Sequence, residues 1–308
     1  MSTDLRIGIV GATGAAGGVM RELLAGRPGV RYFASARSAG EKLDGTPIEE
    51  ATADALSAGD LDLCFFAVGA AESGELVPAA VAGGAVAIDK SSAFRMAPDV
   101  PLVVPEVNGA RAAEHRGIVA VPNCSTIQLV CALKPLHDAA GLARVRVSTY
   151  QSASGAGKDA MERLRSESPE EHDLRADWPF DGEEFEEEAK LREETRKILE
   201  LPDLAFQATC VRVPVLVGHL ESVWVETVEP LGPEQARDLL ADAPGLRLVE
   251  LPSPAQAAGI DDVLVGRIRR DPTVENGLTF LVAGDNLRKG AALNALQIAE
   301  LLFERVPA

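Results

Sequence analysis

Short apolar runs alternate with segments of helical periodicity over the first third of the chain. The apolar runs, at residues 5–10, 30–35, 61–69 and 85–92, are short and largely continuous, as is typical of parallel strands that are buried on both faces. Helical patterns follow at residues 19–26, 52–58 and 72–82. This alternation predicts a Rossmann-like, doubly wound parallel sheet of the α/β class.

The pattern changes near residue 121. Longer segments with alternating polar and apolar residues follow at 144–151, 204–215, 221–229, 262–271 and 279–285. They predict an α+β domain with a mixed, largely antiparallel sheet. A highly charged helical region is expected over residues 163–200, and a long helical pattern ends the chain. We therefore expect a nucleotide-binding domain at 1–122, rejoined by a C-terminal helix at 287–308, and a catalytic and dimerisation domain at 123–286.

The net charge of −17 over 308 residues argues against nucleic acid as a partner, because a phosphate backbone requires a basic footprint. No apolar run approaches the ~20 residues that a membrane helix needs. The first residues also lack the basic and apolar regions of a signal peptide. We accordingly expect no membrane partner and a cytoplasmic location.

A glycine-rich loop joins the first strand to the first helix. Glycine recurs at every third position, in Gly11, Gly14 and Gly17. Such a loop lets the backbone approach a pyrophosphate, which the helix N-terminus then binds. The alternative is a turn-rich junction without a ligand. The expected cofactor-binding residues of this loop are Gly11, Thr13, Gly14, Ala15, Ala16 and Gly17.

The end of the second strand indicates which dinucleotide is bound. NAD enzymes usually carry an acidic residue there, which holds the ribose 2′-hydroxyl. Here the positions are Ser35, Arg37 and Ser38, which suit a 2′-phosphate. The sequence thus favours NADP, although Arg37 could also be an ordinary loop arginine.

One of the four cysteines stands apart from the others. Cys64, Cys131 and Cys210 lie in apolar segments and are expected to be buried, and no metal-binding cluster is apparent. Cys124 instead follows a Pro-Asn turn, directly before a helix expected to begin at Ser125 or Thr126. A helix N-terminus stabilises a thiolate, so Cys124 is a candidate nucleophile. The alternative is a purely structural helix cap.

Ordered motifs extend from one end of the chain to the other and resemble the aspartate-semialdehyde dehydrogenase family. They are GATGAAG (11–17), SSAFR (91–95), VPEVN (104–108), PNCST (122–126), TYQSASGAG (149–157), EEAKLREETRKIL (187–199), VRVPVLVGH (211–219), VGRIRRD (265–271) and DNLRKGAALNALQIAE (285–300). The resemblance implies reversible NADPH-dependent reductive dephosphorylation of L-aspartyl-4-phosphate to L-aspartate-4-semialdehyde. It also implies a place in lysine, methionine and threonine biosynthesis.

The resemblance implies a role for each matching residue. Cys124 would form a thioester, His219 would act as acid/base, and Gln151 would orient the substrate. A turn at Pro214 or Gly218 must separate Arg212 from His219, since their spacing places them on opposite faces of one strand. The substrate-binding residues would be Arg212 for the α-carboxylate, Glu187 for the amine, and Arg95, Asn123 and Lys190 for the phosphate. Further cofactor contacts would come from Ser154, Gly155 and Asn286.

Two departures from the family pattern are visible. Val121 stands where the family commonly has asparagine, and the segment 171–185 is short. That segment contributes to the subunit interface in relatives, so a homodimer and a dimer of dimers both stay open. Two other functions also stay open: an N-acetylglutamyl-phosphate type of acyl-phosphate reductase, and a non-catalytic nucleotide-binding paralogue.

Overall fold

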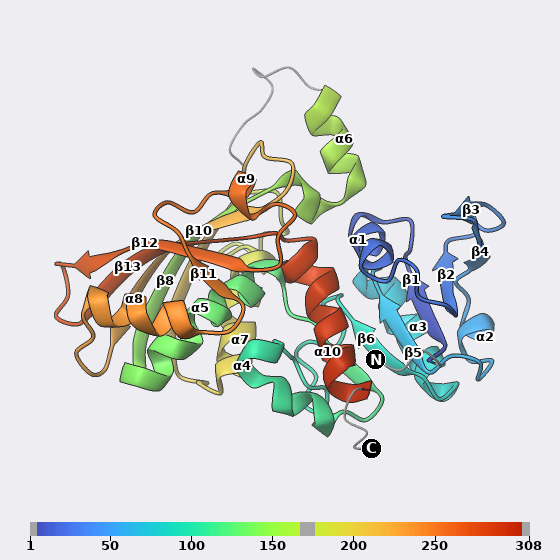
Figure 1. Cartoon of the computed structure of the whole chain (residues 1–308), viewed down its shortest axis with the longest axis horizontal. Helices are drawn as coiled ribbons and strands as arrows, with labels where there is room; N and C mark the ends of the chain where they lie inside the picture. The colour runs from blue at the N-terminus through green and yellow to red at the C-terminus, as the bar shows by residue number, and fades with distance from the viewer. Residues whose placement is uncertain (1–4, 167–175, 304–308) are drawn as a thin grey trace. The chain divides into compact units, whose positions relative to one another are not determined.

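The computed structural model describes residues 5–166 and 176–303 (Figure 1). Contacts within the chain divide it into two compact units, Met1–Pro122 with Ala291–Ala308, and Asn123–Gly290. Each unit is built on one sheet. Over the described residues, every helix is too short or too polar to cross a membrane.

The first unit contains a sheet of seven strands in the order β3-β4-β2-β1-β5-β6-β7. Only the β3–β4 pairing is antiparallel. When the six parallel strands are numbered along the chain, their order is 3-2-1-4-5-6, the Rossmann order. This arrangement confirms the predicted fold class. The strands are β1 (Ile7–Val10), β2 (Val30–Ala34), β3 (Lys42–Leu43), β4 (Thr46–Glu50), β5 (Leu63–Phe66), β6 (Val86–Asp89) and β7 (Ile118–Ala120).

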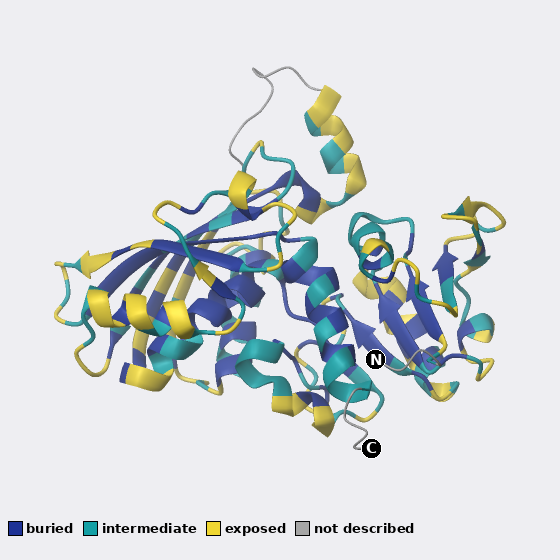
Figure 2. Ribbon diagram, in the orientation of Figure 1, coloured by how far each residue is buried: buried dark blue, intermediate teal, exposed yellow. Residues whose placement is uncertain are grey.

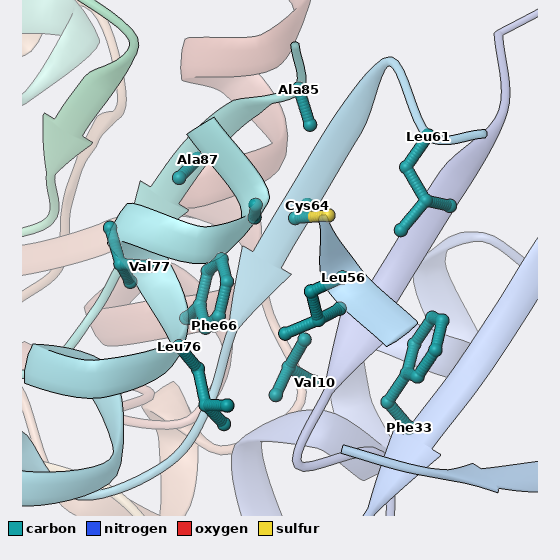
Figure 3. Close-up of a cluster of buried hydrophobic side chains, with 11 residues drawn as sticks. Val10, Phe33, Leu56, Leu61, Cys64, Phe66, Leu76, Val77, Ala85 and Ala87 are labelled. Atoms are coloured by element: carbon teal, nitrogen blue, oxygen red, sulfur yellow. The ribbon is translucent and has the colours of Figure 1, made fainter. Parts of the chain in front are cut away.

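Helices bury the apolar faces of this sheet. One core cluster joins Phe33 of β2, Cys64 and Phe66 of β5, and Val77 of the following helix (Figure 3). Continuous burial of β1 and β5 explains why these strands read as unbroken apolar runs. The helices of the unit are α1 (Ala15–Leu23), α2 (Ala53–Leu56), α3 (Ala70–Ala82), α4 (Pro105–Asn108), η1 (Gly109–Glu114) and α10 (Leu293–Phe303).

The second unit contains a mixed sheet of six strands in the order β11-β12-β13-β10-β8-β9. The pairs β8–β9 and β11–β12 are parallel, and the other pairs are antiparallel, as predicted. The strands are β8 (Leu142–Gln151), β9 (Ala205–Arg212), β10 (His219–Thr227), β11 (Leu246–Leu248), β12 (Val263–Asp271) and β13 (Gly277–Gly284).

The helix α5 (Cys124–Ala140) packs on β8, β10, β12 and β13 and is largely buried (Figure 2). The other helical segments of this unit are η2 (Ala153–Ala156), α6 (Lys158–Ser166), α7 (Glu186–Leu199), α8 (Pro233–Asp242), α9 (Pro254–Ala257) and the first part of η4 (Arg288–Ala292). Along β10, residues buried beneath the helices alternate with half-buried ones such as Ser222 and Trp224. The second set lies on the opposite face of the sheet.

The expected helix over 163–200 is wrong in its middle. α6 ends at Ser166, α7 begins at Glu186, and residues 176–185 between them are not helical. Pro179 disfavours helix at Trp178 and lacks an N–H group. Asp181 then accepts hydrogen bonds from two following backbone N–H groups and closes a turn. Of the segment noted as short, residues 171–175 lie outside the described part.

Candidate active site

The topology of the second sheet brings four candidate residues to one end of it. β8 and β9 are parallel, so Gln151 and Arg212 lie side by side at their ends. β10 runs the opposite way and begins there with His219, which pairs with the last residue of β13, Gly284. Asn286 follows two residues later. The turn expected between Arg212 and His219 is present, and Gly218 in it has a φ of +93°.

Cys124 is the first residue of α5, one position earlier than predicted. Asn123 caps the helix, since its Oδ1 accepts a hydrogen bond from the Ser125 N–H at 2.9 Å. The N-terminal end of the helix dipole therefore lies at Cys124. Its Sγ is 3.2 Å from His219 Nε2, so the candidate nucleophile and the candidate acid/base lie within hydrogen-bonding distance of each other.

His219 is fully buried on its strand. Burial and, to a smaller extent, the nearby Arg212 charge lower the pKa of its imidazole to about 3, whereas a hydrogen bond with the Gly218 backbone opposes the shift. On the side away from Cys124, Nδ1 accepts a hydrogen bond from the Ser152 N–H at 3.0 Å. The ring is therefore neutral near pH 7.

A hydrogen-bond network lies on the Nδ1 side of the His219 ring, away from Cys124. Asn286 Oδ1 accepts from Ser152 Oγ at 3.1 Å, from Ser154 Oγ at 3.0 Å and from the Gly218 N–H at 2.9 Å. Asn286 Nδ2 donates to Ser154 Oγ at 2.8 Å. All three side chains are buried, so the predicted cofactor residues Ser154 and Asn286 contact one another and Ser152.

Two hydrogen bonds hold the Arg212 guanidinium. Its Nη1 donates to the Ser152 carbonyl at 2.9 Å, and its Nε donates to Asp177 at 3.2 Å. An ideal Cβ on Gly155 would lie 3.0 Å from Arg212 Nη1 and 3.3 Å from His219 Nε2. The guanidinium and the imidazole therefore border the same small volume, which only a glycine at position 155 leaves open.

Gln151 is buried and donates from Nε2 to Thr149 Oγ1 at 3.2 Å. Its amide is therefore held in place by the residue two positions earlier, on the same face of β8.

Two carboxylates of α7 hold the turn before Cys124. Asn123 donates from its backbone N–H to Glu194 at 2.6 Å and from Nδ2 to Glu187 at 2.9 Å. Lys190 lies 2.7 Å from Glu186 and 4.0 Å from Glu187. The structure thus brings together three of the predicted substrate residues, Asn123, Glu187 and Lys190.

Arg95, the remaining predicted phosphate ligand, belongs to the first unit. It is buried there, and its guanidinium donates to the carbonyls of Val121 and Lys90.

The glycine loop has the geometry of a nucleotide-binding loop. Gly11 has a φ of +85°, and a Cβ there would lie 2.6 Å from the Ala67 carbonyl oxygen. A Cβ on Gly17 would lie 2.1 Å from the Gly11 oxygen. Gly14 is the N-cap of α1 and makes no side-chain hydrogen bond to it. The first N–H groups of a helix have no partner within the helix and can bind an anionic ligand. Thr13, Ala15 and Ala16 are half-buried in the same loop.

The three residues chosen for the 2′-phosphate follow β2 directly. Ser35 and Arg37 are exposed, Ser38 is half-buried, and the Ser38 N–H donates to the Ser35 carbonyl at 2.9 Å. The glycine loop is tied to the same strand, since the Gly11 N–H donates to the Phe33 carbonyl at 2.8 Å. The loop and the three residues are thus neighbours at the end of β2.

The other cysteines have the predicted structural character. Cys64, Cys131 and Cys210 are buried. Burial raises the pKa of the Cys64 thiol to about 12 and also raises that of Cys210. At neutral pH both thiols are protonated, which leaves them poor nucleophiles.

Three residues that contact His219, Cys124 or the turn before Cys124 were not identified from the sequence. Ser152 contacts His219 through its main chain, Glu194 lies one helical repeat of seven after Glu187, and Gly290 lies against Cys124. The heptad spacing of the two glutamates, with apolar Leu191 between them on the buried side of α7, was the only available signal.

Two family models match the chain. The model for the semialdehyde dehydrogenase NAD binding domain covers residues 6–115. The model for the semialdehyde dehydrogenase dimerisation domain covers residues 133–183 and 180–289.

Individual proteins match over nearly the whole chain. The aspartate-semialdehyde dehydrogenase of Streptomyces akiyoshiensis is 45% identical, with 97% of this chain and 98% of the relative covered. The crystal structure of aspartate semialdehyde dehydrogenase II complexed with ASA from Vibrio cholerae is 38% identical, with a TM-score of 0.92 and coverage of 99% and 100%. The structure of aspartate semialdehyde dehydrogenase with NADP from Candida albicans is 25% identical, with a TM-score of 0.78 and coverage of 97% and 98%.

Proposed function

The chain belongs to the aspartate-semialdehyde dehydrogenase family, and from this premise we propose that it converts L-aspartyl-4-phosphate reversibly to L-aspartate-4-semialdehyde through a thioester on Cys124. Membership makes it an oxidoreductase with an NAD(P)-binding Rossmann-like domain. The observation that carries the proposal is the 3.2 Å separation of Cys124 Sγ and His219 Nε2 at the N-terminus of α5.

The proposed chemistry begins with attack of the Cys124 thiolate on the C4 carbonyl of the acyl phosphate. The bond from carbon to the phosphate oxygen breaks, and phosphate leaves with the electron pair. NADPH, when bound, supplies the hydride that reduces the resulting thioester. The tetrahedral adduct then releases the aldehyde and regenerates the thiolate, which His219 Nε2 and the start of α5 stabilise.

The substrate would be held by the charged side chains around this pair. Arg212 would bind the α-carboxylate, because its guanidinium borders the same volume as the imidazole. Glu187 would contact the amine, and Gln151 would orient the reacting carbonyl. We assign the phosphate to Asn123, Lys190 and, by resemblance alone, Arg95.

The first unit suits a dinucleotide, because glycine is required where a Cβ would close the loop at Gly11 and Gly17. We propose that residues 1–122, with the C-terminal helix, bind NADP. Exposed Arg37 supports this choice, as does the Candida relative solved with NADP. Arg37→Ala should raise the KM for NADP severalfold and leave that for NAD unchanged. On the family resemblance, we also propose cofactor contacts from Ser154, Gly155 and Asn286.

We further propose a cytoplasmic homodimer that serves lysine, methionine and threonine biosynthesis. The dimerisation-domain model covers the second sheet, and half-buried Ser222 and Trp224 lie on the face of β10 opposite α5. That face would pack against a second copy. Trp224→Glu should shift the chain towards monomer in size-exclusion chromatography with light scattering, whereas Trp224→Phe should not.

The decisive experiment is NADP reduction at 340 nm with L-aspartate-4-semialdehyde and inorganic phosphate. Wild type should be active, and Cys124→Ala should be inactive. Cys131→Ala is the matched control, since it removes a thiol from the same helix. Loss of activity in both variants would point to damage of the helix rather than to a nucleophile.

The same assay separates the remaining alternatives. Activity with N-acetylglutamate semialdehyde in place of L-aspartate-4-semialdehyde would overturn the substrate assignment. A chain that binds NADPH but turns over neither aldehyde would be a non-catalytic paralogue. Activity with NAD equal to that with NADP would overturn the cofactor assignment.

A further inference from the structure

Asn123 uses all of its polar groups at the start of α5. Its carbonyl accepts the first hydrogen bond of the helix, from the Ile127 N–H at 3.0 Å. Its Oδ1 accepts from the Ser125 N–H, and its Nδ2 donates to Glu187. Its backbone N–H donates to Glu194 Oε2 at 2.6 Å. Each polar group of this N-cap residue is therefore held by a different partner.

The acid that accepts the N–H of an N-cap residue usually belongs to the same helix. In such a capping box it is a glutamate or glutamine at the third helical position. That position in α5 is Thr126, whose Oγ1 has no hydrogen-bond partner among the described residues. Glu194 of α7, 71 positions along the chain from Asn123, supplies the acceptor instead. The start of α5 is thus capped by a second helix.

The Asn123 N–H is the only backbone donor between Val121 and Cys124, because Pro122 has no N–H group. Asn123 is 7% exposed, so without an acceptor from the protein this N–H would be buried and unsatisfied. The connection that leads into Cys124 would then lose its fixed orientation. Glu194 accordingly determines how the chain enters the helix that begins with the proposed nucleophile.

Glu194 occupies a position where a carboxyl group is costly. The side chain is 1% exposed and shares the buried side of α7 with Leu191 and Ile198. This helix packs on α5. A buried carboxyl lowers stability unless hydrogen bonds compensate for its lost hydration, and an apolar residue would avoid that cost. The choice of an acid therefore points to a role other than packing.

We propose that Glu194 is a positioning residue for the reaction: through the Asn123 N–H it fixes the orientation in which Cys124 meets the substrate carbonyl. The inference rests on the proposed role of Cys124 as the nucleophile. Glu187, the other acid at Asn123, binds the side-chain amide and is proposed to contact the substrate amine. Glu194 binds the main chain instead, so it acts on the chemical step rather than on substrate affinity.

Substitutions at position 194 separate the hydrogen bond from the carboxyl group. Glu194→Gln keeps the length of the side chain and an acceptor oxygen, whereas Glu194→Asp keeps the carboxyl but is one methylene shorter. We expect Glu194→Gln to retain kcat within about threefold of wild type. Glu194→Asp and Glu194→Ala should lower kcat about tenfold or more, with the KM for L-aspartate-4-semialdehyde within about twofold. An active Asp variant beside an inactive Gln variant, or equal kcat in all of them, would overturn the proposal.

Leu191→Ala is the matched control for packing. It removes a fully buried apolar side chain from the same side of α7 and should lower the urea midpoint at least as much as Glu194→Ala does. Its kcat should nevertheless stay within about twofold of wild type. If kcat falls as far in Leu191→Ala as in Glu194→Ala, any loosening of α7 is sufficient, and the positioning role is overturned.

Alkylation of Cys124 by iodoacetamide at pH 7 tests the same role without turnover. The other three cysteines are buried, and mass spectrometry of the modified peptide identifies the site. We expect slower alkylation in Glu194→Asp and Glu194→Ala, because a displaced thiol loses the stabilisation of its thiolate at the helix start. Glu194→Gln should match wild type.

The two measurements distinguish the failure of this inference from the failure of the proposed function. If wild type is inactive as a dehydrogenase but the alkylation rates keep the expected order, the substrate assignment is wrong and the positioning of Cys124 by Glu194 stands. Alkylation that is unchanged or faster in Glu194→Asp and Glu194→Ala would overturn the positioning role. Should these two variants not fold, a loss of kcat in folded Glu194→Gln would overturn it as well.

Discussion

Asp177 Oδ2 lies 3.2 Å from Arg212 Nε, so the cation proposed to bind the substrate carboxylate already has a carboxylate partner from its own chain. The Trp178 ring lies against the same guanidinium, with Arg212 Cζ 4.5 Å from its centroid. The Asp177 side chain is 32% exposed, against 11% for Arg212. Water therefore reaches the Asp177 carboxylate more readily than the Arg212 guanidinium. Asp177 can accordingly exchange with another carboxylate at Arg212.

Asp177→Asn should lower the KM for L-aspartate-4-semialdehyde and leave kcat unchanged. A partly exposed ion pair contributes ~0.2–1 kcal/mol, so the expected decrease is up to about fivefold. Asp181→Asn removes the same charge from the same segment and controls for the overall field. A KM that rises in Asp177→Asn alone would show that Asp177 orients Arg212 instead of competing with the substrate.

Gly290 determines where Cys124 can lie. A Cβ at position 290 would be 2.9 Å from Cys124 Cβ and 3.3 Å from its Cα. Gly290→Ala should therefore displace Cys124, the proposed nucleophile, lowering kcat more than about tenfold and destabilising the fold by ~1–3 kcal/mol. Steady-state kinetics and thermal unfolding measure the two effects. Gly74→Ala on α3, where a Cβ meets nothing within 4 Å, should change neither kcat nor folding to that extent.

The sequence predicted the strands that are buried along their whole length. β1 and β5 are buried at every position, so their apolar runs were visible without any knowledge of their neighbours. The two-residue strand β3 and the three-residue strand β11 are too short to show a period, and they exist because of their partners in the sheets. The break before α7 depends on Pro179 and on the Asp181 turn, which the surrounding charge run obscured.

Motifs predicted the side chains of the site better than the contacts among them. Cys124 and His219 were found from their local sequence, yet their 3.2 Å contact arises because α5 packs on β10 and brings together residues 95 positions apart. Ser152 acts through a main-chain N–H, which its residue type does not reveal. Asp177 lies outside any motif, and only the folded chain places it beside Arg212.

Glu221→Gln should stabilise the protein increasingly as the pH rises from 5 to 8. Burial raises the pKa of the Glu221 carboxyl well above its usual range, and the Gln128 amide opposes this shift. Above the unfolded pKa of ~4.3 the unfolded chain loses this proton while the folded chain keeps it, so folding stability falls with rising pH. Urea unfolding at each pH measures the difference, and Glu226→Gln on the same strand is the control. A difference independent of pH would contradict a protonated Glu221.

His219 should produce the opposite dependence on pH. Its folded pKa of about 3 lies below the unfolded value of ~6.5, so between these values the unfolded chain holds a proton that the folded chain lacks. Its contribution to stability is complete above pH 6.5 and is lost as the pH falls. Between pH 8 and pH 5 the wild type should therefore lose ~2 kcal/mol relative to His219→Gln, measured by urea unfolding. His137→Gln should show no such divergence from wild type. If the wild type and His219→Gln run parallel, the folded ring takes up its proton near the unfolded pKa of ~6.5, and burial does not keep the imidazole neutral down to pH 5.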